Sequence, residues 1–194
     1  PMIIVALVLT YISYAIVAAS FVLVAALLLR MALQWAQVNP FGWFALNLRR
    51  LTEPVMRPFR YGLDGRTMRF DMMPLVAAAL VLINGLFAAW IVGQFASVAG
   101  DFAFRRITLG LVLADVVWIA VVIYLAALFA RFLLPMLGFG YSNRFLQVAY
   151  RLTEPVLKPL RRHLIFGAFD FSPLVLIFAV QFIGGMLRAW LMQL

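Results

Sequence analysis

The segment that decides the fold occurs twice in the chain: it reads RLTEPVMRPFR at residues 50–60 and RLTEPVLKPLR at residues 151–161. The copies are 101 residues apart and share eight of their eleven residues. A second motif, Phe-Asp-x-x-Pro, follows each copy and begins at Phe70 and at Phe169. Chance does not produce two such matches in 194 residues, so the sequence is a tandem duplication.

Long apolar stretches lie on both sides of each copy. The chain is 66% hydrophobic and 12% charged, against roughly 45–50% and 25% in soluble domains. A membrane-spanning helix needs about 20 mainly apolar residues. We therefore predict spans over about residues 3–29, 72–98, 107–130 and 171–190.

The ends of the first and last spans depend on particular residues. We expect the first helix to continue a turn or two past Arg30 and to stop before Asn39-Pro40, since the residue before a proline resists the α region. The last uncharged stretch has only 17 residues, 171–187. It reaches full length if Arg188 extends its charged end to the membrane surface and the helix continues through Trp190.

The duplication predicts an all-α membrane protein with four transmembrane helices. Residues 1–100 form the first repeat and residues 101–194 the second, each with one basic loop between its two spans, at 30–71 and at 131–170. Each repeat contains two spans, so both repeats enter the membrane in the same direction. They are therefore parallel repeats, related by a pseudo-twofold axis along the membrane normal.

The distribution of cations predicts the orientation. Residues 30–71 hold seven arginines, residues 131–170 hold six cations, and the remaining segments hold only three. Because short cytoplasmic loops carry the excess of Lys and Arg, we expect both basic loops in the cytoplasm. Both termini would then be periplasmic in a bacterial inner membrane.

The duplicated motif suggests short helices lying in the membrane interface. Threonine is a good N-cap, and proline fits the first helical turn, so Thr52 and Thr153 are each expected to start a helix. Upstream apolar residues at helical spacing extend the same amphipathic pattern. The cations expected to reach anionic lipid headgroups are Arg57, Arg60, Lys158 and Arg161. A ligand site or a nucleic-acid site is the alternative, and a basic surface facing lipid explains the composition better.

Charged residues at the ends of the spans come in matching sets. Arg30 ends the first span and Asp71 precedes the second, and Arg131 and Asp170 repeat this arrangement. A charge at the membrane boundary is stabilised by a partner, so we expect ion pairs Arg30–Asp71 and Arg131–Asp170 that fix each hairpin. The alternative is a cation-binding or proton-relay site made of Asp71, Asp170, Glu53 and Glu154.

Asp115 is an intramembrane carboxylate outside the repeat, because Tyr14 stands at the equivalent position. Such a group is by default a functional candidate. The alternative, which we favour, is a protonated Asp115 hydrogen-bonded between helices to a polar residue: Asn84, Gln94, Gln181 or a tyrosine.

The composition narrows the possible chemistry. The chain has no cysteine and one histidine, which excludes thiolate nucleophiles, Cys/His zinc sites and multi-histidine metal clusters. The net charge of +9 is better explained by contact with anionic lipid than with nucleic acid. We therefore expect no catalytic residues, no metal and no cofactor.

The motifs also resemble those of a known family, over essentially the whole chain. Leu51-Thr52-Glu53-Pro54 and Leu152-Thr153-Glu154-Pro155, each followed by Phe-Asp-x-x-Pro, are similar to the YggT family, called YlmG in its single-repeat form. The second copy, with Ser172-Pro173, matches the family pattern best, and Met73 replaces the serine in the first copy. The resemblance implies an association with osmotic tolerance, with cell division and nucleoid distribution, or with haem attachment to cytochrome b6 in chloroplasts.

Two functions remain open at this point. The leading hypothesis is a non-enzymatic membrane protein that organises or assists the assembly of other membrane components through its basic cytoplasmic face. Its partners would be anionic lipids, other membrane proteins and further copies of the chain. The alternative is a small ion channel or transporter in osmotic balance, which Asp115 and the paired acidic residues support. Four helices enclose little space, so a pore would require a homo-oligomer.

Overall fold

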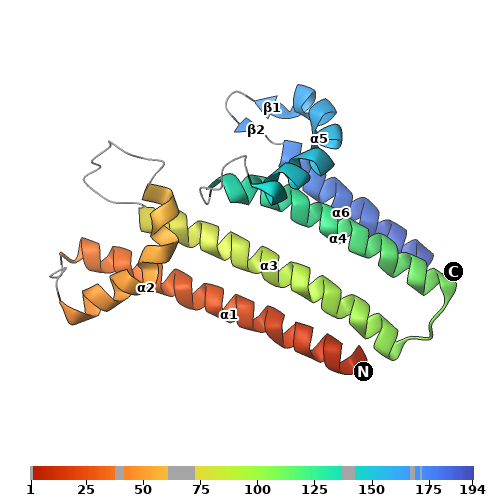
Figure 1. Cartoon of the computed structure of the whole chain (residues 1–194), viewed down its shortest axis with the longest axis horizontal. Helices are drawn as coiled ribbons and strands as arrows, with labels where there is room; N and C mark the ends of the chain where they lie inside the picture. Colours follow the sequence, from red (N-terminus) through yellow and green to blue (C-terminus); the bar gives the residue numbers. More distant parts are fainter. Residues whose placement is uncertain (1, 38–41, 61–72, 137–142, 167–168, 171) are drawn as a thin grey trace. The chain divides into compact units, whose positions relative to one another are not determined.

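The described part of the chain folds almost entirely into α-helices, as a computed structural model shows (Figure 1). The structure describes residues 2–37, 42–60, 73–136, 143–166, 169–170 and 172–194. In chain order the elements are α1 Met2–Trp35, α2 Trp43–Arg60, α3 Met73–Phe104, α4 Leu109–Met136, α5 Arg144–Leu164, β1 Ile165–Phe166, β2 Phe169–Asp170 and α6 Ser172–Leu191. The two strands have two residues each and pair antiparallel, with Ile165 opposite Asp170 and Phe166 opposite Phe169.

Three of these helices are long and apolar enough to cross a membrane. The qualifying segments are Met2–Trp35, Met73–Phe104 and Leu109–Arg131, and Val175–Leu191 is a shorter apolar helix. The all-α membrane architecture that the sequence predicts is therefore confirmed at this level. The tiny β1–β2 pair is an addition that periodicity did not predict.

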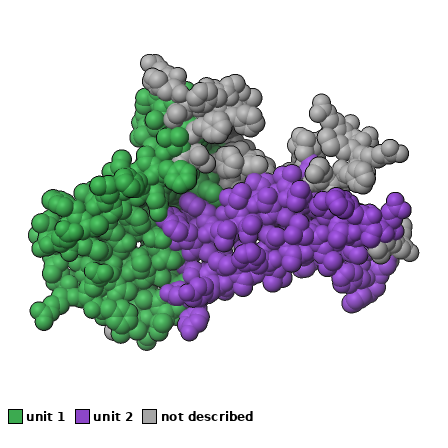
Figure 2. Space-filling view, turned by 180° about the vertical axis from the view of Figure 1, so that it is seen from behind, with its two compact units in different colours: residues 1–9, 93–135, 139–194 green, residues 10–92, 136–138 purple. Residues whose placement is uncertain are grey.

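The chain divides into two compact units (Figure 2). The N-terminal unit comprises residues 10–92 and 136–138, and so contains most of α1, all of α2 and the first part of α3. The C-terminal unit comprises residues 1–9, 93–135 and 139–194, and so contains α4, α5 and α6 with the last part of α3.

In the N-terminal unit, α1, α2 and α3 share a small apolar core. Leu27 from α1, Met56 from α2, and Ala77 and Ala78 from α3 are all buried in it. Further along the same pair of helices, a Cβ atom on Gly85 would overlap the Ser20 hydroxyl. Small residues at both points let the α1 and α3 backbones approach closely, which is the usual way that helices pack in lipid.

In the C-terminal unit, a glycine brings α6 close to α4. A Cβ atom on Gly184 would lie 2.8 Å from a methyl carbon of Val121, whereas one on the adjacent Gly185 would meet nothing within 4 Å. Only the first of the two glycines therefore faces α4. This contact aligns the two helices side by side, as Figure 1 also shows.

The end of α1 is where the sequence predicts it. The helix continues past Arg30 to Trp35, and the chain turns at Ala36-Gln37, before Asn39-Pro40. Gln37 has φ 50°, in the left-handed region. Glycine is the residue usually found in this conformation after a helix.

The prediction that Thr52 and Thr153 start helices is wrong. Both lie in the interior, since α2 begins at Trp43 and α5 at Arg144. The threonine hydroxyls donate to the carbonyls of Leu48 at 2.8 Å and Ala149 at 2.7 Å, four residues earlier. Prolines interrupt the backbone ladder beyond them: Pro54 and Pro155 lie two residues after the threonines, and Pro159 lies six residues after Thr153. Pro54, Pro155 and Pro159 are all exposed.

Candidate functional site

The first cluster joins α1 to α2 within the N-terminal unit. Arg30 is buried, and its Nη1 donates a hydrogen bond of 2.8 Å to the Thr52 hydroxyl. The same nitrogen lies 3.6 Å from Oε2 of Glu53. Since the Thr52 hydroxyl donates its own hydrogen to Leu48, its oxygen is oriented to accept from the arginine.

The second cluster repeats these contacts between α4 and α5 in the C-terminal unit. Nη1 of the buried Arg131 donates to the Thr153 hydroxyl at 3.1 Å, and Nη2 lies 2.6 Å from Oε2 of Glu154. The Arg131 guanidinium also stacks over the Tyr150 ring, 4.1 Å from its centroid. On its other side, Glu154 lies 3.5 Å from Nη1 of Arg161.

Each cluster attaches an amphipathic helix to an apolar one through a single arginine. A buried guanidinium is stable only when its charge and its donors find partners, and the Thr-Glu pair supplies both. The Thr-Glu pair of the duplicated motif therefore binds an arginine that lies 22 residues before the threonine in the sequence. The predicted pairs Arg30–Asp71 and Arg131–Asp170 involve aspartate side chains that lie outside the described residues, and they stay predictions.

The surface of α5 carries two parallel lines of side chains, one mainly apolar and buried, the other apolar and exposed. One line, Leu146, Ala149, Thr153 and Leu157, is fully or almost fully buried against its own unit. The other line is exposed: Phe145 is 82% exposed, Val148 63%, Leu152 45% and Val156 43%. The exposed cations Arg151 and Lys158 lie on the remaining side. An apolar line beside a basic side is the pattern of a helix in a membrane interface.

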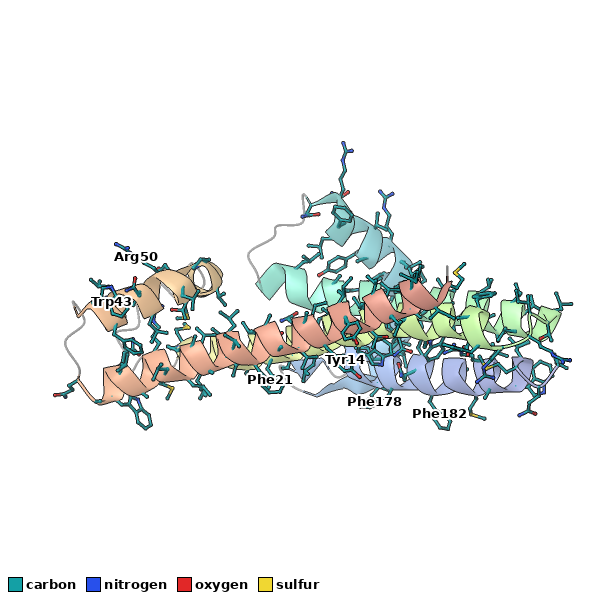
Figure 3. All side chains as sticks on the ribbon, turned by 90° about the horizontal axis from the view of Figure 1, so that it is seen from below. Tyr14, Phe21, Trp43, Arg50, Phe178 and Phe182 are labelled. Carbon is teal, nitrogen blue, oxygen red and sulfur yellow. The ribbon has the colours of Figure 1, made fainter. Side chains whose placement is uncertain are left out.

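The N-terminal unit has a similar surface on α2. Phe44 and Leu51 are exposed on one face of α2, and Thr52 and Met56 are buried on the adjacent face. Arg50 is exposed as well, and Figure 3 shows it with Trp43 on the same helix. The side chains of Arg57 and Arg60 lie outside the described residues. Exposed aromatic residues also occur on the apolar helices, where Figure 3 shows Phe178 and Phe182 of α6 pointing away from the helix.

A third charged cluster, in the C-terminal unit, corrects the expectation for Asp115. Asp115 is 1% exposed, and its Oδ1 accepts a hydrogen bond of 2.9 Å from Nη2 of Arg188. The same nitrogen donates to Oδ2 of Asp101 at 2.7 Å. Asn84 and Gln94, two of the expected partners, bind the Leu80 carbonyl and the Trp118 indole instead.

Arg188 belongs to the same cluster and lies in the last turn of α6, which continues through Trp190 to Leu191. It is 15% exposed and points toward Asp101 and Asp115, with its guanidinium 5.1 Å from the Trp118 ring centroid. The two carboxylates are on other helices, Asp101 on α3 and Asp115 on α4, so this arginine links three helices. Asp101 has a further partner in Arg105, at 2.8 Å.

The remaining residues of the duplicated motifs lie in α5 and at the start of α6. Ser172 and Pro173 are the first two residues of α6, where serine and proline are both favoured. Leu152 is exposed on α5 and Pro155 lies in its interior. Within the described part of the chain, no group of three His, Cys, Asp or Glu residues could hold a metal ion.

The sequence of the chain is similar to known sequences over most of its length. The sequence matches the CCB3/YggT family over residues 2–92 and 110–191. It is similar to an uncharacterized protein of Haemophilus influenzae, with 32% identity over 164 residues that cover 81% of each chain. No solved structure matches the chain.

Proposed function

Because the chain belongs to the CCB3/YggT family and carries apolar membrane-spanning helices, we propose that it is a non-enzymatic membrane protein with a basic interfacial face. Through this face it binds anionic lipids and organises or assists the assembly of other membrane components. Each unit supplies one amphipathic helix for this contact, α2 in the N-terminal unit and α5 in the C-terminal unit.

The observation that carries the proposal is the exposed apolar line of α5, defined above by Phe145, Val148, Leu152 and Val156. Exposure of four large apolar side chains in a row to water is unfavourable. In an interface, acyl chains cover the line while Arg151 and Lys158 reach the headgroups. The Arg131 cluster supports the same position, because it attaches α5 to the end of the apolar helix α4.

We further propose the topology that the sequence predicts. α6 is the fourth span, and the two repeats are parallel and related by a pseudo-twofold axis along the membrane normal. The basic loops lie in the cytoplasm and both termini in the periplasm of the bacterial inner membrane. The equivalent contacts of Arg30 and Arg131 support the two-repeat arrangement, and the excess of cations in 30–71 and 131–170 supports the orientation.

The test is a pair of single charge removals. Lys158→Gln removes an exposed cation of α5, and Arg106→Gln removes an exposed cation outside both interfacial helices. One headgroup contact is worth about 1 kcal/mol, or roughly a fivefold change in affinity. The readout is the ratio of phosphatidylglycerol to phosphatidylcholine retained by the protein from mixed micelles, measured by native mass spectrometry.

We expect Lys158→Gln to lower this ratio several-fold and Arg106→Gln to leave it near the wild-type value. The double variant Arg151→Gln/Lys158→Gln should lower it further. Equal ratios for wild type and the double variant would contradict the proposal. An equal loss in Arg106→Gln would show that net charge, and not α5, selects the lipid.

A further inference from the structure

The buried triad of Asp101, Asp115 and Arg188 has no part in the proposed lipid contact. It contains two carboxylates and one guanidinium, and each of the three side chains is at most 15% exposed. Its own formal charge is −1. Arg105 also touches Asp101, but it is 58% exposed, so water shares its charge. The buried part of the network therefore keeps an excess of negative charge among apolar helices.

Two buried atoms of the triad have no hydrogen-bond partner, Nε of Arg188 and one carboxylate oxygen of Asp115. Oδ1 of Asp115 accepts from Arg188, whereas its Oδ2 is buried and has no hydrogen-bond partner. An ionised carboxylate oxygen that is buried without a donor is costly. A carboxylic acid at the same position carries no charge and still accepts the Arg188 hydrogen bond through its other oxygen.

We infer that the triad binds one exchangeable proton at Oδ2 of Asp115. The proton comes from solvent and forms an O–H bond on Oδ2. Arg188 keeps its own protons and its bond to Oδ1, and the charge of the triad changes from −1 to 0. Asp101 has some exposure to solvent and shares Nη2 of Arg188 with Asp115, which links the buried site to the surroundings.

The groups around the site favour a proton over a metal ion. The charged groups are Asp101 in the last turn of α3, Arg105 directly after that helix, Asp115 on α4 and Arg188 on α6. Their uncharged polar neighbours are Trp118, stacked on Arg188, and Gln94, which accepts from the Trp118 indole. Two carboxylates that already bind an arginine offer few of the six or more oxygen ligands that hard cations prefer.

The experiment is infrared difference spectroscopy of the full chain in lipid nanodiscs, recorded between acidic and alkaline pH. A protonated carboxyl has a C=O stretching band that shifts in D₂O because its proton exchanges. Asp115→Asn should remove one such band, since the amide keeps an oxygen for Arg188 but binds no proton. The matched control, Glu154→Gln, removes a carboxylate that pairs with Arg131 outside the triad and should retain the band.

A second variant covers the case in which Asp115→Asn does not fold, as judged by gel filtration. Asp115→Glu keeps an acid and should shift the band frequency without removing the band. A band that persists unshifted in both Asp115 variants overturns the inference. So does a band that disappears in Asp101→Asn and remains in Asp115→Asn. A wild-type spectrum with no such band, combined with thermal stabilisation by sodium chloride over choline chloride, would also overturn it.

Discussion

Replacement of Thr153 by valine isolates the central hydrogen bond of the second cluster. Valine keeps the shape and removes the hydroxyl that accepts from Arg131 at 3.1 Å. A hydrogen bond to a charged group contributes about 1.5–3 kcal/mol. The bond that the hydroxyl donates to Ala149 adds little, because that carbonyl is already part of the helix ladder. We expect Thr153→Val to lower the free energy of unfolding by about 2 kcal/mol, since Arg131 keeps Glu154 and Tyr150 as partners.

The assay is thermal unfolding in detergent, followed by the fluorescence of the five tryptophans. For a chain of this size, about 2 kcal/mol corresponds to a midpoint lower by roughly 4–8 °C. Thr153→Ser is the matched control, because it keeps the hydroxyl and loses only a methyl group. If the valine variant is as stable as the serine variant, the threonine does not hold Arg131, and our explanation of the duplicated motif is wrong.

Three further predictions concern packing, a turn and topology. Gly184→Ala should lower the thermal midpoint, because its Cβ would lie 2.8 Å from Val121, and Gly185→Ala, which meets nothing within 4 Å, should leave it unchanged; equal midpoints would contradict the α4–α6 contact. Gln37→Gly should stabilise the chain by roughly 0.5–1 kcal/mol in chemical unfolding, because glycine adopts φ 50° without strain; a loss of stability would count against that turn. A reporter fused after Leu194 should be active only in the periplasm, and activity only in the cytoplasm would reverse the topology.

The helices were predictable because their causes are local. Long apolar stretches specify α1, α3 and α4, and the Asn39-Pro40 pair predicts the end of α1 within a few residues. The starts of α2 and α5 were not predictable from the Thr-Glu-Pro motif. Threonine there has the chemistry of an N-cap, but its hydroxyl binds an arginine from another helix. The start of α5 is capped locally instead, because the side-chain oxygen of Asn143 accepts a hydrogen bond from the Phe145 backbone N–H.

The sequence identifies the charged residues that require partners, but it does not identify which residues pair. The sequence shows that Arg30 and Arg131 lie at span ends and that Asp115 lies within one. It does not show that Asp115 would meet Arg188, which is 73 residues away. Pairing over that distance depends on how α4 and α6 pack. Tyr150 and Asp101 were missed for the same reason, because nothing in their local pattern indicates an arginine.

The contact between Gly85 and Ser20 has a consequence for the evolution of the N-terminal unit. The backbone of α3 leaves no room for a side chain at position 85 while position 20 carries a hydroxymethyl group. A relative with alanine at position 85 would therefore need glycine at position 20, since the Ser20 Cβ would itself lie 2.5 Å from the added methyl group, or a wider separation of its two helices. Substitutions at these two positions should thus occur together. In an alignment of relatives, small residues at both positions would indicate that α1 and α3 lie close together.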